Sequence, residues 1–277
     1  MKKFELPDWL RIINPSVLAR LGCVRHAVFD FDGTISVLRQ GWELVMERVM
    51  LEALCPHGDA PETLVNEVRR YIDASTGQLT IVQMRWLSEA VRRYGSSRSP
   101  RTPQEYKACY LDALMVSVRQ RLADLECGAA NTEDHMIAGA KDLLKGLAER
   151  GVRIYIASGS DHEDVVHEAS ALGIAKYIQG GIYGALDASE ANAKDRIIQR
   201  ILFEHRLIGD ELLVAGDGPV EMIEARARGA IAMGVPSDEV ARRGWNEYKV
   251  PRLATTGADF LTADYLHATE LIDLLLQ

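Results

Sequence analysis

The chain has 277 residues, of which 47% are apolar and 26% are charged. This balance is that of an ordinary globular protein and excludes a disordered chain, which would carry far fewer apolar residues. The net charge of −8 argues against a generic nucleic-acid binder, which needs clustered Lys and Arg, and no apolar stretch approaches the length of a membrane span.

The cysteines and the first residues bear on the compartment. The four cysteines show neither C-x-x-C spacing nor a histidine at zinc-finger distances, which is typical of ordinary thiols in a reducing compartment. The opening MKKFELPDWLRIINP carries Glu5, Pro7 and Asp8 where a signal peptide needs an unbroken apolar run. We therefore expect a cytoplasmic protein. Oligomeric state and the role of residues 1–20 stay open.

The first predicted element is a buried strand over residues 24–30, an apolar run that stops at FDFDGT. From about residue 38 to 132 helical patterns dominate and no strand signal appears, with breaks at 55–61 and 95–103. This region is interpreted as an all-helical insertion after the first strand.

Strand and helix signals alternate through the rest of the chain. Apolar runs at 152–158, 212–216, 230–235 and, more weakly, 259–262 predict strands. Helical patterns occupy 138–151, 161–173, 194–205 and 219–229. The alternation predicts an α/β fold, with a Rossmann-like parallel sheet covered by helices on both faces. The expected domains are a discontinuous core of residues 1–37 and 133–277 and a helical domain of residues 38–132.

The strongest chemical signal is Asp30-Phe31-Asp32-Gly33-Thr34. Strand alternation places Asp30 and Asp32 on one side and turns Phe31 toward the core. Two close carboxylates repel one another unless a cation or a shared proton intervenes, so the pair suits a divalent metal with oxygen ligands. It also suits a division of labour in which one carboxylate attacks and the other moves a proton. Gly33 permits a sharp turn, and Thr34 adds a hydroxyl nearby.

Two weaker signals follow further along the chain. Ser158 and Gly159 end the second predicted strand before a helix N-terminus, which suits an anion, although many such turns are simple caps. Lys194 opens a helix, where a cation is unfavourable against the dipole unless it neutralises a phosphate or a carboxylate.

A second pair of acids lies at the end of the strand at 212–216. Asp217 follows the strand directly, and Glu221 lies one turn into the next helix on the same side. The pair suits a hard cation, and an N-terminal helix cap explains Asp217 almost as well. All four signals fall at the C-terminal ends of predicted parallel strands, where open α/β sheets bind ligands.

The order FDFDGT, Ser158, Lys194 and GDxxxE resembles the haloacid dehalogenase (HAD) superfamily over roughly residues 24–38 and 136–265. The resemblance implies a Mg²⁺-dependent phosphatase acting on a small phosphorylated metabolite. It implies that Asp30 is the nucleophile that forms an aspartyl-phosphate and Asp32 the acid/base.

The resemblance also implies roles for the other matching positions. Ser158 would bind the phosphate and Lys194 would balance charge. Asp217 would bind Mg²⁺ with the Asp30 carboxylate and the Asp32 backbone carbonyl. Glu221 departs from the usual Asp, so a water or Lys194 would connect it to the metal.

The region at 38–132 resembles the cap that some members of the superfamily insert after the first motif. Arg39 and Trp42 follow the hinge and face an anionic or sugar-like substrate in this interpretation. Gln78, Thr80 and Arg85 are further polar candidates, although an ordinary helix face explains each of these five residues better.

Two other functions compete with the phosphatase. A sugar phosphomutase would use the same residues and differ only in how the cap delays water attack. A non-catalytic metal-binding scaffold is a different class, and the presence of both Asp30 and Asp32 argues against it.

Overall fold

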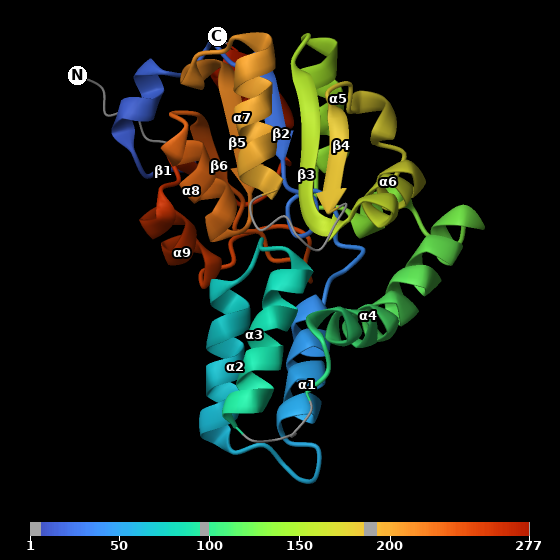
Figure 1. Ribbon diagram of the computed structural model, residues 1–277. Helices are drawn as coiled ribbons and strands as arrows, with labels where there is room; N and C mark the ends of the chain where they lie inside the picture. The colour runs from blue at the N-terminus through green and yellow to red at the C-terminus, as the bar shows by residue number, and fades with distance from the viewer. Residues whose placement is uncertain (1–6, 95–99, 186–192, 277) are drawn as a thin grey trace.

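The computed structural model describes residues 7–94, 100–185 and 193–276, and residues 193–195 by their backbone alone. A seven-stranded sheet with the order β1-β7-β6-β5-β2-β3-β4 forms its centre (Figure 1). The first strand is antiparallel to its neighbour and the others are parallel. The strands are β1 (Leu10–Ile12), β2 (His26–Phe29), β3 (Arg153–Asp161), β4 (Gly181–Ala185), β5 (Leu212–Gly216), β6 (Ile231–Gly234) and β7 (Phe260–Thr262).

Helices cover both faces of this sheet, as the alternation predicted (Figure 1). They are α5 (Ala140–Glu149), α6 (His162–Ala171), α7 (Ala193–His205), α8 (Pro219–Ala227), α9 (Lys249–Thr256) and α10 (Ala268–Leu276). In β2, Ala27 and Phe29 pack in the core shared with α5, α6 and α10, whereas Val28 packs with α7, α8 and α9. Both faces are buried because successive side chains of a strand point to opposite sides.

Four helices follow β2 and lie beyond the C-terminal ends of the parallel strands (Figure 1). They are α1 (Trp42–Leu54), α2 (Glu62–Ala74), α3 (Thr80–Arg93) and α4 (Pro103–Glu126). Because β2 and β3 are hydrogen-bonded neighbours, these helices are an insertion between two adjacent strands. Their apolar stripes pack on one another and join the core on one side of the sheet. The division into domains at residues 38 and 132 stays a prediction.

The sequence analysis did not predict two of the strands, β1 and β4. Near the N-terminus, β1 pairs with β7, and Trp9 stacks on His267 with ring centroids 5.2 Å apart, so this part of the leading segment packs on the core. The other missing strand, β4, reads GIYGA and pairs with β3. Its glycines weaken the strand signal, and the pairing supplies what local propensity lacks. In the described part of the chain, none of the helices is long and apolar enough to cross a bilayer.

A buried histidine at the opposite end of β2 makes the stability of the fold depend on pH. His26 is 9% exposed, its Nδ1 lies 2.9 Å from the Tyr155 hydroxyl, and the His205 ring is 4.6 Å away. Burial, and then the charge of His205, lower the pKa of His26 to about 4 from an ordinary 6.5. As pH falls from about 6.5 toward 4, His26 binds a proton in the unfolded chain but stays neutral in the folded one. The free energy of unfolding therefore decreases over this pH range.

Replacing His26 tests this linkage. We expect the Tm of the wild type to fall between pH 7 and pH 4.5 by at least about 2 °C more than the Tm of His26→Gln. The exposed His57→Gln serves as the control and follows the wild type. Equal pH slopes for all three proteins, measured by circular dichroism, would contradict the assignment.

Candidate active site

The chain turns sharply where β2 ends, and the turn presents two carboxylates. The Asp30 N–H donates to the Ala215 carbonyl of β5 at 2.8 Å, which extends the sheet by one residue. Asp30 is 5% exposed, while Phe31 is fully buried in the core, as the alternation predicted. The Gly33 N–H donates to the Ser36 carbonyl at 2.9 Å and closes the turn.

Gly33 is needed for two reasons. Its φ of +73° lies in the left-handed region that favours glycine. A Cβ on Gly33 would also lie 2.5 Å from Asp217 Oδ2, too close for any side chain. The carboxylate that ends β5 therefore abuts the backbone of the first motif, and the two acidic strand ends form one site.

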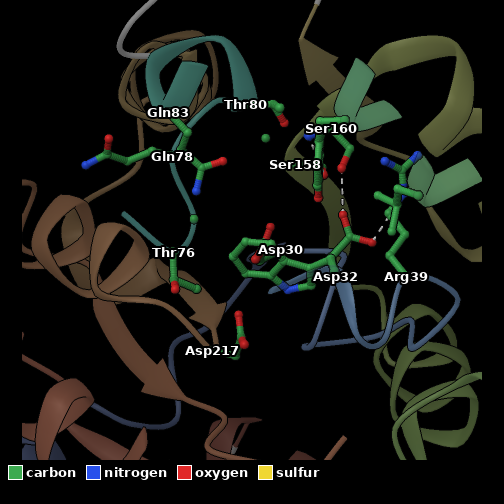
Figure 2. A pocket seen from close by; sticks show the side chains of 15 residues that line it. Asp30, Asp32, Arg39, Thr76, Gln78, Thr80, Gln83, Ser158, Ser160 and Asp217 are labelled. Carbon is green, nitrogen blue, oxygen red and sulfur yellow. Dashed lines mark hydrogen bonds and ion pairs between the residues drawn. The ribbon is translucent and has the colours of Figure 1, made fainter. Parts of the chain in front are cut away.

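A single cavity of about 580 Å³, including its part open to solvent, gathers the acids of both strands. Figure 2 shows Asp30, Asp32 and Asp217 at its lower side, with polar side chains of the inserted helices across from them. The core also contributes Ser158, Gly159 and Ser160, and residue 39 comes from the link to α1. The inserted helices contribute Trp42, Thr76, Gly77, Gln78, Thr80, Gln83, Tyr110 and Leu114.

Ser160, near the C-terminal end of β3, holds Asp32 in place. The Ser160 hydroxyl donates to Asp32 Oδ2 at 2.8 Å (Figure 2). The Ser158 hydroxyl accepts from the Ser160 N–H at 3.1 Å, which orders the turn. Ser160 was not among the predicted site residues, although it lies within the Ser-Gly-Ser element. The bond orients one Asp32 oxygen and leaves the other toward the guanidinium of the hinge.

That guanidinium belongs to Arg39, which is 4% exposed. Its Nε and Nη2 donate to Glu168 Oε1 at 3.0 and 2.6 Å, and Nη2 also donates to Asp164 at 3.2 Å. Asp32 Oδ1 lies 3.8 Å from Nε. Burial by itself would lower the pKa of Arg39, but the three carboxylates outweigh it and keep the guanidinium charged. Arg39 lines the cavity, where a substrate contact was predicted, and acids of α6 accept hydrogen bonds from its Nε and Nη2.

A buried lysine that the sequence analysis missed sits beside Asp217. Lys249 Nζ donates to Asp217 Oδ2 at 2.6 Å and to Glu239 Oε1 at 2.5 Å. Burial alone would lower the pKa of Lys249, but the two carboxylates hold it above its ordinary value. The sequence did contain a signal, because Lys249 opens α9 just as Lys194 stands near the start of α7.

Two predicted site residues whose side chains are described, Thr34 and Glu221, are not among the residues that line the cavity. Thr34 is fully buried. Glu221 is 2% exposed, and its carboxylate lies beside Gly77 and Gly218. The side chain of Lys194 falls outside the described residues, so its predicted role is untested. Arg85, a polar candidate of the inserted helices, is exposed and also lies away from the cavity.

The segment 76–80, which runs from the α2–α3 loop to the first residue of α3, closes over the C-terminal ends of the core strands. A Cβ on Gly159 would lie 2.8 Å from the Gln78 carbonyl oxygen, and one on Gly218 would lie 3.2 Å from the Thr76 carbonyl oxygen. The approach at Gly159 is too close for a Cβ and the approach at Gly218 is tight, so both glycines make room for this segment. The cavity is thereby covered by groups of the inserted helices.

The donor set fits a magnesium ion held by few protein ligands. Mg²⁺ is commonly bound through one or two carboxylates, with waters and substrate phosphate completing the shell. Asp30 and Asp217 supply carboxylates, and the Asp32 carbonyl is a further oxygen at the same strand end. Within the described residues, no three His, Cys, Asp or Glu side chains converge as a metal cage.

Comparison with known proteins identifies a family that matches most of the chain. A family model described as haloacid dehalogenase-like hydrolase matches residues 24–229. No curated protein matches the chain.

Solved structures share the architecture at low identity. A predicted phosphoglycolate phosphatase from Haemophilus somnus is 14% identical with a TM-score of 0.61, over 90% of this chain and 97% of that one. A hydrolase from Pseudomonas syringae is 19% identical with a TM-score of 0.59, over 91% and 100%. A β-phosphoglucomutase from Clostridium difficile is 12% identical with a TM-score of 0.58, over 90% of this chain and 97% of that one.

The close approach at Gly159 can be tested by adding one methyl group. We expect Gly159→Ala to push segment 76–80 away from the core loop, because the new Cβ would meet the Gln78 carbonyl at 2.8 Å. Backbone amides of residues 76–80 then exchange hydrogen about tenfold faster or more by mass spectrometry. Gly58→Ala, where a Cβ meets nothing within 4 Å, is the control. Unchanged exchange in Gly159→Ala would show that the segment does not rest on this loop.

The buried lysine should matter for stability. Lys249→Met leaves two carboxylates buried together, so the free energy of unfolding falls by about 3–5 kcal/mol. The double variant Lys249→Met/Glu239→Gln regains part of that loss, because one of the two charges is removed. Lys145→Met, whose side chain is 54% exposed, changes stability by less than about 0.5 kcal/mol. Urea denaturation measures all three, and an unchanged midpoint for Lys249→Met would contradict the ion-pair assignment.

Proposed function

The chain belongs to the haloacid dehalogenase-like hydrolases, and on that premise we propose that it is a Mg²⁺-dependent phosphatase of small phosphomonoesters. The observation that carries the proposal is one cavity lined by Asp30, Asp32 and Asp217 at adjacent strand ends. The name of the solved phosphatase from Haemophilus somnus agrees with this activity. Mg²⁺ would be held by the carboxylates of Asp30 and Asp217 and the carbonyl of Asp32, and when bound it supplies positive charge against the phosphoryl oxygens.

In the proposed mechanism Asp30 is the nucleophile. One of its carboxylate oxygens attacks phosphorus in line with the leaving oxygen, so one P–O bond forms while the other breaks. The anionic phosphoryl group is received by the Ser158 hydroxyl and by backbone N–H groups of the Ser158–Ser160 turn. Lys194 is expected to neutralise further charge there.

Asp32 handles the proton in both halves of the reaction. It gives a proton to the leaving oxygen and then takes one from the water that attacks the aspartyl-phosphate. The bond from Ser160 fixes Oδ2, so its carboxyl is held at one edge of the cavity rather than free to rotate. The reaction ends with inorganic phosphate, the alcohol and a free Asp30.

A sugar phosphomutase is the second candidate. It would transfer the phosphoryl group from Asp30 to a sugar hydroxyl instead of water, and the solved protein from Clostridium difficile carries that name. The cover formed by segment 76–80 is the observation that favours it, because excluding water is what a mutase needs. A non-catalytic scaffold is disfavoured, since the acids of both motifs share one cavity.

Hydrolysis of p-nitrophenyl phosphate with and without Mg²⁺ tests the proposal. The wild type gives steady turnover that EDTA abolishes and Mg²⁺ restores. Asp30→Asn lowers kcat by at least about 1,000-fold because an amide oxygen is a poor nucleophile. The fold persists by circular dichroism, since removing one of several crowded charges costs little packing. The exposed Asp59→Asn keeps wild-type rates.

Each alternative gives a different result in the same assay. Wild-type turnover by Asp30→Asn would overturn the nucleophile. Slow turnover that a bisphosphorylated sugar stimulates would indicate the mutase. A scaffold would give no turnover at all.

A further inference from the structure

We propose that the leaving group of the substrate is uncharged and carries hydroxyls, so that the transferred phosphoryl group is the only anion of the substrate. This inference rests on the proposed phosphatase activity and narrows its substrate class to phosphorylated polyols and sugars. The argument comes from the charges and the free hydrogen-bonding groups of the cavity.

Among the described residues, the cavity lining offers no positive charge that lacks an acidic partner. Among the described residues that line it, the ionisable acids are Asp30, Asp32 and Asp217, and Arg39 is the one cation. Arg39 makes a forked pair with Glu168 and a further bond to Asp164, both from α6. Its charge is therefore already balanced inside the protein.

Two other described lysines, Lys107 and Lys249, do not change this balance. Lys107 on α4 lies in the neighbouring pocket and is paired with Asp161 at the end of β3. Lys249 is buried behind Asp217 and is not part of the cavity lining. The side chain of Lys194 lies outside the described residues, and its expected place is at the transferred phosphoryl group. A divalent cation would balance the reacting acids, which leaves nothing for a carboxylate or a second phosphate.

The inserted helices present neutral hydrogen-bonding groups instead. Gln78 and Thr80 face the acids across the cavity (Figure 2), and the Tyr110 hydroxyl lies in the same lining. Within the described structure, the side chains of these three residues have no hydrogen-bond partner. Water or substrate hydroxyls would form hydrogen bonds with these side chains. A carboxylate buried there would lose its hydration free energy and gain no cation as a partner.

Apolar surface completes the leaving-group side. Trp42, which is half-buried, and the buried Leu114 line the cavity beside these polar groups. An aromatic face next to hydroxyl-binding groups suits the carbon skeleton of a polyol, whose C–H groups pack on the ring while its hydroxyls bond outward. This apolar surface adds no favourable binding energy for a charged group.

Matched pairs of phosphates that differ in one group test the inference. Glucitol 6-phosphate and 6-phosphogluconate differ only in CH₂OH against carboxylate at the far end, and glycerol 3-phosphate and 3-phosphoglycerate form a shorter pair. We expect kcat/KM to be at least about tenfold higher for the neutral member of each pair. Where a pair is not turned over, the inhibition constants against p-nitrophenyl phosphate supply the same ratio. An equal or reversed preference in both pairs overturns the proposal.

A variant that adds the missing charge provides the second arm. Gln78 is exposed at the mouth of the cavity, so Gln78→Arg should fold normally. It should raise kcat/KM or affinity for the carboxylate member by several-fold relative to the neutral one. Gln104→Arg, on the exposed side of α4, is the matched control and leaves the ratio unchanged. If Gln78→Arg leaves the ratio where it was, the neutral lining does not set the preference.

The two proposals fail in different ways. Absence of Mg²⁺-dependent turnover of p-nitrophenyl phosphate removes the phosphatase itself. Normal turnover of that compound with a preference for the carboxylate members removes only the inference about the leaving group.

Discussion

The crowding of three carboxylates at one edge of the sheet is the constraint on which the rest of the site depends. Like charges this close raise the cost of folding unless each is countered. Asp32 receives the Ser160 hydroxyl and faces Arg39, while Asp217 is paired with Lys249. Asp30 lines the cavity, where the proposed metal would act. Asp32 and Asp217 therefore have different partners, which suits the different roles proposed for them.

The parallel sheet and a few glycines bring these groups together. Parallel strands end on the same edge, so motifs nearly 190 residues apart in the chain become neighbours through the β2–β5 pairing. The final approach depends on missing side chains. Gly33 admits the Asp217 carboxylate and Gly159 admits the backbone of the cover. The site is therefore built by backbone contact as much as by the functional side chains.

Sequence patterns predicted the parts of the molecule that are local. Each inserted helix and each buried central strand carries its own periodicity, and the acids after β2 and β5 follow apolar runs directly. The parts that depend on distant partners were missed. β4 is a strand because β3 pairs with it, and Lys249 matters because Asp217 lies beside it. Arg39 stood out as a substrate contact, but only the fold reveals that the acids of α6 already bind it. The role of Lys194 stays a prediction.

The buried cluster around Arg39 explains how one scaffold can combine a strongly charged reaction with a neutral specificity site. A guanidinium this deep needs acidic partners to remain charged, and α6 supplies two of them. Arg39 faces Asp32 at 3.8 Å and ties the start of the inserted helices to the core, and three carboxylates already balance its charge. The site would then select among phosphoesters by binding those with a charged leaving group weakly, rather than by binding one charged leaving group tightly. Such selection is effective because an unpaired anion in a covered cavity loses its water and gains no partner.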